Sequence, residues 1–160
     1  MDGLDQLARH DVVHAALGMH PDGITGLSSS LFSLAIRPAE PSRLHLTVAR
    51  EALAAARSPL WKSSTRRIVD LPSELPCYLV AGTISVPGIE QPLFQAKVTT
   101  AHADGLHFLV LDLTSAALQY LDSYTEIIEA ITHTISFSDP EPKPAPPGPP
   151  ATSRILEVLQ

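Results

Sequence analysis

Three apolar runs that follow one another at short intervals constrain the fold of this chain more than any other feature. They are CYLVAGTISV (77–86), LFQAKVTTA (93–101) and LHFLVLDL (106–113). The segments between them, PGIEQP and HADG, hold the Pro, Gly and Asp residues that tight turns require. Because short connections join antiparallel neighbours, these runs predict a three-stranded antiparallel meander.

The region before the meander predicts a hairpin and then a helix. LFSLAIRP (31–38) and RLHLTVAR (43–50) each alternate in apolar character, and the Pro-containing AEPS between them suits a hairpin connection. EALAAAR (51–57) has the composition of a helix, which Pro59 would end. Residues 58–76 carry three prolines and are expected to form a loop with one short strand or helical turn.

The stretch after the meander predicts a helix over about 114–134. Thr114 or Ser115 is placed to cap its first turn. One apolar stripe follows at helical spacing: Leu118, Leu121, Tyr124, Ile128 and Ile131. ISF (135–137) has the composition of a further short strand.

Residues 1–20 are expected to form an N-terminal helix. In GLDQLARHDVVHAAL (3–17) apolar residues recur at roughly helical spacing, and Gly18 is a natural stop. The end of this stretch, HDVVHAALGMH, holds His10, His14 and His20. On a helix the first two would lie one turn apart, which suits two imidazole ligands of zinc.

This histidine spacing resembles the zinc-binding signature of the metzincin proteases, H-E-x-x-H-x-x-G-x-x-H. Three departures weigh against a catalytic zinc ion. Asp11 stands where the signature has Glu, the glycine is displaced by one position, and no methionine follows Met19 to form the methionine turn of those proteases. We therefore expect no metal ion, and His10, His14 and His20 are weak candidate ligands only.

The composition excludes several classes of function. The net charge is −6, so no nucleic-acid partner is expected, since phosphate backbones need clustered Lys and Arg. No run approaches the ~20 apolar residues that span a bilayer. No signal peptide opens the sequence, so we expect a cytoplasmic protein without a membrane span. The single cysteine, Cys77, rules out an internal disulfide.

The motifs of common enzyme and cofactor sites are missing from the sequence. It has neither a G-x-S-x-G elbow nor a glycine-rich phosphate loop. Cys77 has two candidate partner bases, His102 and His107, but nothing in the sequence brings them together. A lone cysteine beside an apolar run is usually a small core residue. We expect no catalytic residue and no cofactor.

Together these elements predict one α+β domain over 24–138. We expect an antiparallel sheet of about five or six strands flanked by helices. After Phe137 the composition changes, because SDPEPKPAPPGPP holds seven prolines among thirteen residues. Residues 139–160 are therefore expected to be a Pro-rich flexible tail that ends in a short amphipathic piece, SRILEVLQ.

The order of elements from about 31 to 139 resembles the PsbP-like fold superfamily. The resemblance lies in SLAIRPAEPSRLHLTVARE as a hairpin, YLVAGTISVPG and LFQAKVTTAHADGLHFLVLDLTSAA as a meander, and YLDSYTEIIEAITHTISF as a closing helix. It implies an α/β/α sandwich in which the closing helix packs back on the sheet. The closing helix with its terminal SF is similar to that of DcrB-like and LpqN-like members.

Members of this superfamily have several different functions. Its DcrB-like and LpqN-like members are exported lipoproteins, which need a signal and a lipobox cysteine that this sequence lacks. PsbP itself is a photosynthetic subunit. The Eag-type members are small, acidic, cytoplasmic chaperones that bind apolar segments of type VI secretion effectors, and some end in a Pro-rich tail. The acidity of this chain and its lack of catalytic motifs agree best with the Eag-type members.

We therefore expect a non-enzymatic binding protein, most concretely a chaperone or adaptor that holds an apolar helix or peptide of a protein partner. A homodimer would enclose both sides of such a helix. The sequence leaves open which face of the strands meets the partner. The expected contacts are apolar residues of the meander and one aromatic residue before it: Phe94, Ala96, Val98, Phe108, Val110 and Trp61.

Two alternatives stay open at this stage. The chain has the features of a structural subunit of a larger assembly, docked through SRILEVLQ. It is also compatible with a small enzyme that uses His102 or His107 as a base, in a cleft between the sheet and SPLWKSSTRR (58–67).

Overall fold

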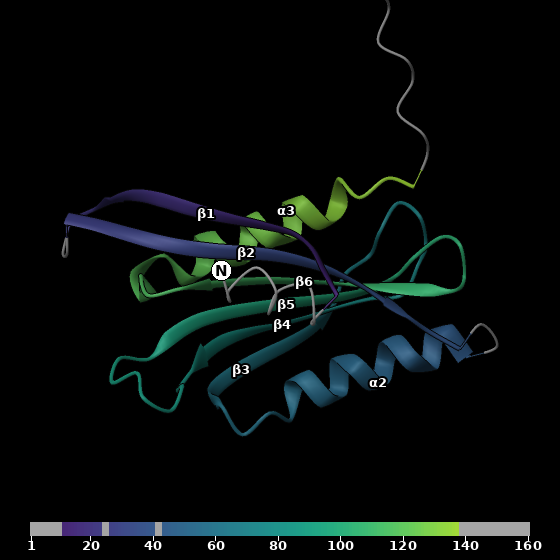
Figure 1. Cartoon of the computed structure of the whole chain (residues 1–160), viewed down its shortest axis with the longest axis horizontal. Coiled ribbons are helices and arrows are strands. Elements are labelled where there is room, and N and C mark those ends of the chain that lie inside the picture. The colour runs from purple at the N-terminus through teal and green to yellow at the C-terminus, as the bar shows by residue number, and fades with distance from the viewer. Residues whose placement is uncertain (1–10, 24–25, 41–42, 138–160) are drawn as a thin grey trace, which may run out of the picture.

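The computed structural model describes residues 11–23, 26–40 and 43–137 of the 160-residue chain. In this part of the chain an antiparallel sheet and two helices make an α+β fold, which confirms the predicted class (Figure 1). The strands are β1 (Val12–Asp22), β2 (Gly26–Pro38), β3 (Trp61–Ile68), β4 (Cys77–Ile84), β5 (Leu93–Ala101) and β6 (His107–Ser115). The helices are α2 (Leu44–Ala56) and α3 (Leu121–His133), with a 3-10 turn, η2 (Leu118–Tyr120), before α3.

The six described strands lie in the order β1-β2-β6-β5-β4-β3, and every neighbouring pair is antiparallel. Strands β4, β5 and β6 are the predicted meander, which is confirmed. Their register places Val98 of β5 between Leu79 of β4 and Leu111 of β6. Strands β1 and β3 are therefore the two edges of the sheet.

The two helices pack on opposite faces of the sheet. Side chains alternate along a strand, and on β5 Val98 lies in the cluster beneath α3 whereas Ala101 lies in the cluster beneath α2. Helix α3 contributes Tyr124 and Ile128 to its cluster, and the Tyr124 ring stacks on Phe94 with the ring centroids 5.6 Å apart. Figure 1 shows α2 and α3 on different sides of the strands.

The predicted N-terminal helix over 1–20 is wrong in its described part. Residues 12–22 form β1, which pairs along its length with β2. Gly18, expected to stop a helix, lies inside this strand opposite Ser30. The strand forms because β2 offers backbone partners to the whole segment, and this pairing overrides a helical spacing that spans only a few turns.

The predicted strand over 43–50, with its hairpin connection, is also wrong. This segment is the first half of α2, and the expected helix over 51–57 is its second half. The buried residues of α2 recur every four positions: Leu44, Val48, Ala52 and Ala56. Leu44 and Val48 fit an alternating strand and a helical stripe equally well. The alanine-rich continuation favours the helix, because alanine has a high helix propensity and is depleted in strands.

One further expected strand is present, and two segments differ from the sequence prediction. Strand β3 is the short strand expected within residues 58–76. Strand β6 runs to Ser115, so the closing helix starts at Leu121 rather than near 114. Residues 135–137, expected as a last strand, are irregular.

Some predictions fall outside the described residues. These are the Pro-rich tail over 139–160, its SRILEVLQ end, and His10. Among the helices that the structure describes, none is both long and apolar enough to cross a membrane.

Candidate binding surface

The outer face of the β1–β2 hairpin carries large apolar side chains in contact with solvent. Phe32, Leu34 and Ile36 of β2 pack against the core beneath α3, so the alternate residues of β2 face the other way. On that other face Leu17 lies opposite Leu31, and Pro21 lies opposite Leu27. The exposed apolar members, which we name the hairpin patch, are Leu17 (68% exposed), Met19 (64%), Leu27 (54%) and Leu31 (49%).

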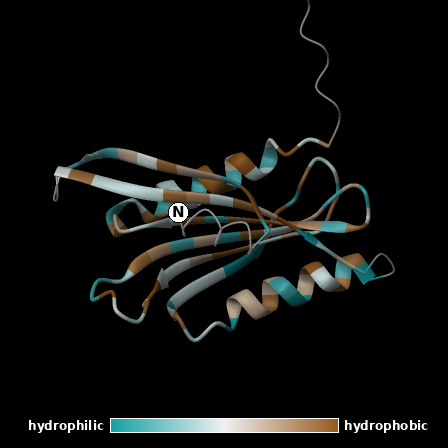
Figure 2. Cartoon of the chain, viewed as in Figure 1, coloured by the Kyte–Doolittle hydropathy of each residue, from teal (hydrophilic) through white to brown (hydrophobic). Residues whose placement is uncertain are grey.

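Helix α2 covers the same side of the sheet as the hairpin patch but does not reach the patch. Its side chains Leu44 and Val48 pack on Ala101 and Phe108, at the end of β5 and β6 far from the hairpin tip. Figure 2 shows hydrophobic segments along both hairpin strands, with α2 lying away from the hairpin tip. The strand register places these side chains near one another on one face, which makes the hairpin patch a candidate interaction surface.

A polar cluster borders the hairpin patch on the same face. Asp112 of β6 lies at its centre, one strand away from the hairpin. Gln95 Nε2 donates to both carboxylate oxygens of Asp112 at 3.0 Å, and Lys97 Nζ lies 3.1 Å from Oδ2. Thr114, which lies opposite Leu31, donates its hydroxyl to Asp112 Oδ1 at 3.1 Å. The face therefore combines an apolar strip with adjacent donors and acceptors.

The inner face of the hairpin is anchored to α3. His20 Nε2 lies 2.6 Å from the hydroxyl oxygen of Tyr124, a buried residue of α3. The His20 ring also meets the rings of Tyr120 and Tyr124 edge-on, with centroids 5.8 Å apart in both pairs. This anchor fixes which face of the hairpin points away from α3, and so presents the hairpin patch to solvent.

Two of the three histidines of the HDVVHAALGMH stretch lie on β1, and His10 lies outside the described residues. His14 and His20 both lie on the inner face, where His14 approaches the Phe32 ring at 6.3 Å between centroids. In the described ranges no three His, Cys, Asp or Glu side chains are grouped so as to hold a metal ion.

The expected partner contacts within the meander are corrected by the structure. Phe94, Ala96 and Val98 are 0% exposed because they lie beneath α3. Phe108 is buried beneath α2, and Val110 is half-buried beside that cluster. These side chains form the interior on which the helices pack, so a partner surface cannot be built from Phe94, Ala96, Val98 or Phe108.

Trp61, the remaining expected contact, holds the start of β3 against α2. Its indole Nε1 donates to the carbonyl oxygen of Ala55 at 2.7 Å. The side chain is half-buried, and its polar atom is already satisfied by the helix.

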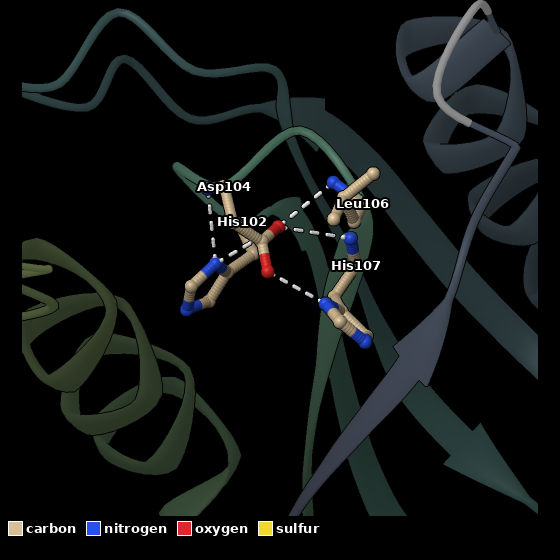
Figure 3. A network of polar contacts seen from close by, with 4 residues as sticks. All are labelled: His102, Asp104, Leu106 and His107. Atoms are coloured by element: carbon tan, nitrogen blue, oxygen red, sulfur yellow. Dashed lines mark hydrogen bonds and ion pairs between the residues drawn. The ribbon is translucent and has the colours of Figure 1, made fainter.

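His102 and His107 lie in the turn between β5 and β6, where both contact Asp104 (Figure 3). His107 Nδ1 lies 2.6 Å from Asp104 Oδ2, and the backbone N–H groups of Leu106 and His107 donate to Oδ1. Partial desolvation raises the pKa of Asp104, but these hydrogen bonds outweigh it and hold the pKa well below its ordinary range. The cluster stabilises a turn. Residues 58–67, the other expected wall of an enzyme cleft, lie mostly within β3, which β4 separates from β5.

Cys77 is a core residue rather than a nucleophile. Burial raises the pKa of its thiol to about 11, although a hydrogen bond with Thr100 works in the opposite direction. The side chain lies in the cluster beneath α3 and is 1% exposed. A thiol in this state is protonated and inaccessible at neutral pH.

Comparison with known proteins identifies a fold but no family. No family model matches the chain, and no curated protein matches it. The crystal structure of PA94 from Pseudomonas aeruginosa, a protein of unknown function suggested to be a regulator, is similar in fold with a TM-score of 0.50. The alignment covers 81% of this chain and 85% of PA94 at 16% sequence identity.

The hairpin patch was not predicted from the sequence. Its two members on β1, Leu17 and Met19, belong to the segment that was predicted as an N-terminal helix with its following turn.

Proposed function

We propose that the protein is a non-enzymatic chaperone or adaptor that holds an apolar helix or peptide of a partner protein on the hairpin patch. The observation that carries the proposal is the exposure of four large apolar side chains on one face of one hairpin. A folded domain gains nothing from leaving such side chains in water, whereas their burial by a partner is favourable at roughly 25 cal/mol per Å².

The polar cluster beside the patch supplies the second half of the binding mechanism. A partner helix or peptide brings backbone and side-chain polar groups that must not be buried without hydrogen bonds. Asp112 has neighbours Gln95, Lys97 and Thr114 whose remaining donors and acceptors lie next to the apolar strip. The cluster is placed to satisfy polar groups at the margin of a bound segment.

We further propose that the working unit is a homodimer formed through β1. This edge strand carries no Asp, Glu, Lys or Arg from Val12 to Pro21, so it lacks the charges that usually block edge-to-edge pairing. A two-fold pairing of two β1 strands has its axis perpendicular to the sheet. It would therefore bring both hairpin patches onto one continuous face, which doubles the apolar surface offered to a bound segment.

The resemblance to the Eag-type chaperones, with the α/β/α sandwich of the PsbP-like superfamily and a cytoplasmic location, belongs to the same proposal. The opposite placement of α2 and α3 supports the sandwich. An apolar surface that α2 and α3 leave uncovered supports a role in holding an apolar segment.

A synthetic peptide tests the proposal. The probe is a helix of about 20 alternating leucine and alanine residues flanked by lysines, labelled with a fluorophore and hereafter the leucine–alanine peptide. The full-length protein should bind it and keep it in solution. The double substitution Leu17→Glu and Leu31→Glu should abolish binding. The matched control Ile127→Glu, at a side chain of α3 that is also 49% exposed, should bind normally.

Two results would contradict the proposal. The peptide would bind neither protein, or the double variant would bind as tightly as the parent chain. The dimer is tested separately by sedimentation: Ala15→Lys on the β1 edge should shift the mass towards the monomer, and an unchanged sedimentation profile would rule out pairing through β1.

A further inference from the structure

Strand β3 presents backbone hydrogen-bonding groups along the second edge of the sheet. The N–H of Val69 donates to the carbonyl of Cys77 at 3.0 Å, which extends the β3–β4 ladder by one residue. Hydrogen-bonded and non-hydrogen-bonded pairs alternate in an antiparallel ladder. The N–H and C=O groups of Ser64, Arg66 and Ile68 consequently point away from β4, towards the open edge.

A groove runs beside this edge, between α2 and strands β3 and β4. It encloses about 340 Å³. Small or apolar side chains of one flank of α2 form its wall: Ala49, Ala52, Leu53 and Ala56. Tyr78 and Val80 of β4 form its floor, and Ile68 of β3, which is 70% exposed, forms the outer lip. A side chain entering from beyond β3 would find apolar contacts on three sides.

The positive charges on β3 favour an acidic partner segment over a second copy of the strand. Arg67 is paired with Glu129 of α3, but Lys62 and Arg66 form no ion pair with another residue of the described part of the chain. Arg66 lines the groove. Two copies of β3 side by side would bring these positive charges together, which disfavours self-pairing. An acidic segment is attracted by the same charges.

We propose that the β3 edge and its groove form a second binding site, which takes an extended acidic peptide as an added β-strand. The peptide backbone pairs with the outward groups of Ser64, Arg66 and Ile68. Alternate apolar side chains of the peptide enter the groove beside α2, and its carboxylates meet Arg66 and Lys62. A helix flanking an edge strand is the arrangement that other peptide-binding domains use for strand addition. This site lies on the opposite edge of the sheet from the hairpin patch and does not depend on it.

A short designed peptide provides the test. The probe is a labelled octapeptide of alternating valine and glutamate, titrated into the full-length protein. Binding should saturate and should slow hydrogen exchange at the amides of Ser64, Arg66 and Ile68. The amides of Thr65 and Arg67, which already pair with β4, should change little. Binding without this alternate pattern of protection would overturn the proposal.

Matched reagents separate strand addition from adhesion by charge alone. The same octapeptide with alternate backbone nitrogens methylated keeps its charge but loses N–H groups, and should bind at least about fivefold more weakly. Arg66→Glu should weaken the glutamate peptide about fivefold and favour a valine–lysine peptide instead. Arg50→Glu, at an exposed position of α2 outside the groove lining, should leave both affinities unchanged.

A variant that alters the backbone gives an independent check. Ser64→Pro removes an outward N–H that the ladder with β4 does not use, so the protein should fold with its circular dichroism spectrum unchanged and lose peptide binding. Equal binding by the methylated peptide would overturn the proposal. Protection of the same β3 amides in the protein alone, rising with protein concentration, would also overturn it, because a second copy would then be the occupant.

Discussion

A substitution at Leu17 should weaken peptide binding without changing the stability of the fold. Leu17 is the most exposed member of the hairpin patch, with 68% of its surface accessible. Full burial of a leucine side chain is worth about 1.5–3 kcal/mol, and about two-thirds of that is still available to a partner, which is about 1–2 kcal/mol. Leu17→Ser should therefore weaken binding of the leucine–alanine peptide by about five- to thirtyfold.

The same substitution should leave the free energy of unfolding within about 0.5 kcal/mol of the parent value, because the side chain is mostly in solvent. Fluorescence anisotropy measures the affinity, and urea unfolding of the full-length chain measures the stability. Ile127→Ser on α3 is the control and should keep the parent affinity. The reasoning is refuted if Leu17→Ser binds like the parent, or if it loses more than about 1 kcal/mol of stability.

Three further predictions concern how the sheet is held together. In Gly82→Ala the new Cβ would lie 2.1 Å from the Ser63 carbonyl oxygen, so urea unfolding should show a loss of at least about 1 kcal/mol; an unchanged midpoint would contradict the close approach. Tyr124→Phe removes the 2.6 Å hydrogen bond to His20 and should lower the free energy of unfolding by about 1 kcal/mol. In a double-mutant cycle, His20→Ala should lower it less in the Tyr124→Phe background than in the parent chain. Full additivity of the two substitutions would contradict the hydrogen bond. The lowered pKa of Asp104 means that its ionised form favours the folded state, so the stability it contributes is present above pH ~4 and is lost as the pH falls below that value. Asp104→Asn should flatten the thermal-melting profile in this acid range, and an unaltered profile would contradict the turn cluster.

The meander was predictable because its signals are local. Pro, Gly or Asp residues lie in the two connections that join β4 to β5 and β5 to β6, and each strand has eight or nine residues, the length of one strand. The closing helix was predictable for the same reason, because Tyr124 and Ile128 repeat at helical spacing and lie in the core. Local pattern and tertiary packing agree in this half of the chain.

The strand predicted over 31–38 is confirmed as part of β2. The segments 3–17 and 43–50 were mispredicted because each fits both a helical and a strand periodicity. Leu44 and Val48 lie two strand repeats or one helical turn apart, and packing on Phe108 selects the helix. Val12 to Asp22 forms a strand only because β2 lies beside it, a pairing that no local pattern of the segment specifies. Single-sequence periodicity does not resolve such cases.

The candidate site was missed as a consequence of the same error. With residues 3–17 taken as a helix, Leu17 counted as part of a helical stripe instead of a strand face. The alternation of β5 was recognised, but its residues Phe94, Ala96 and Val98 turn towards α3 and become core. Which face of a strand a helix covers depends on chain connections beyond the strand, so the sequence alone did not reveal it.

The central claim is that an apolar partner segment lies on the hairpin patch, and methyl-resolved nuclear magnetic resonance tests it most directly. The sample is the full-length protein with labelled Leu and Met methyl groups and the unlabelled leucine–alanine peptide. The account predicts intermolecular contacts from the peptide to the methyl groups of Leu17, Met19, Leu27 and Leu31, with the core methyl groups of Leu79 and Leu111 undisturbed. Peptide contacts confined to other methyl groups, such as that of Leu53 in the α2 groove, would contradict it.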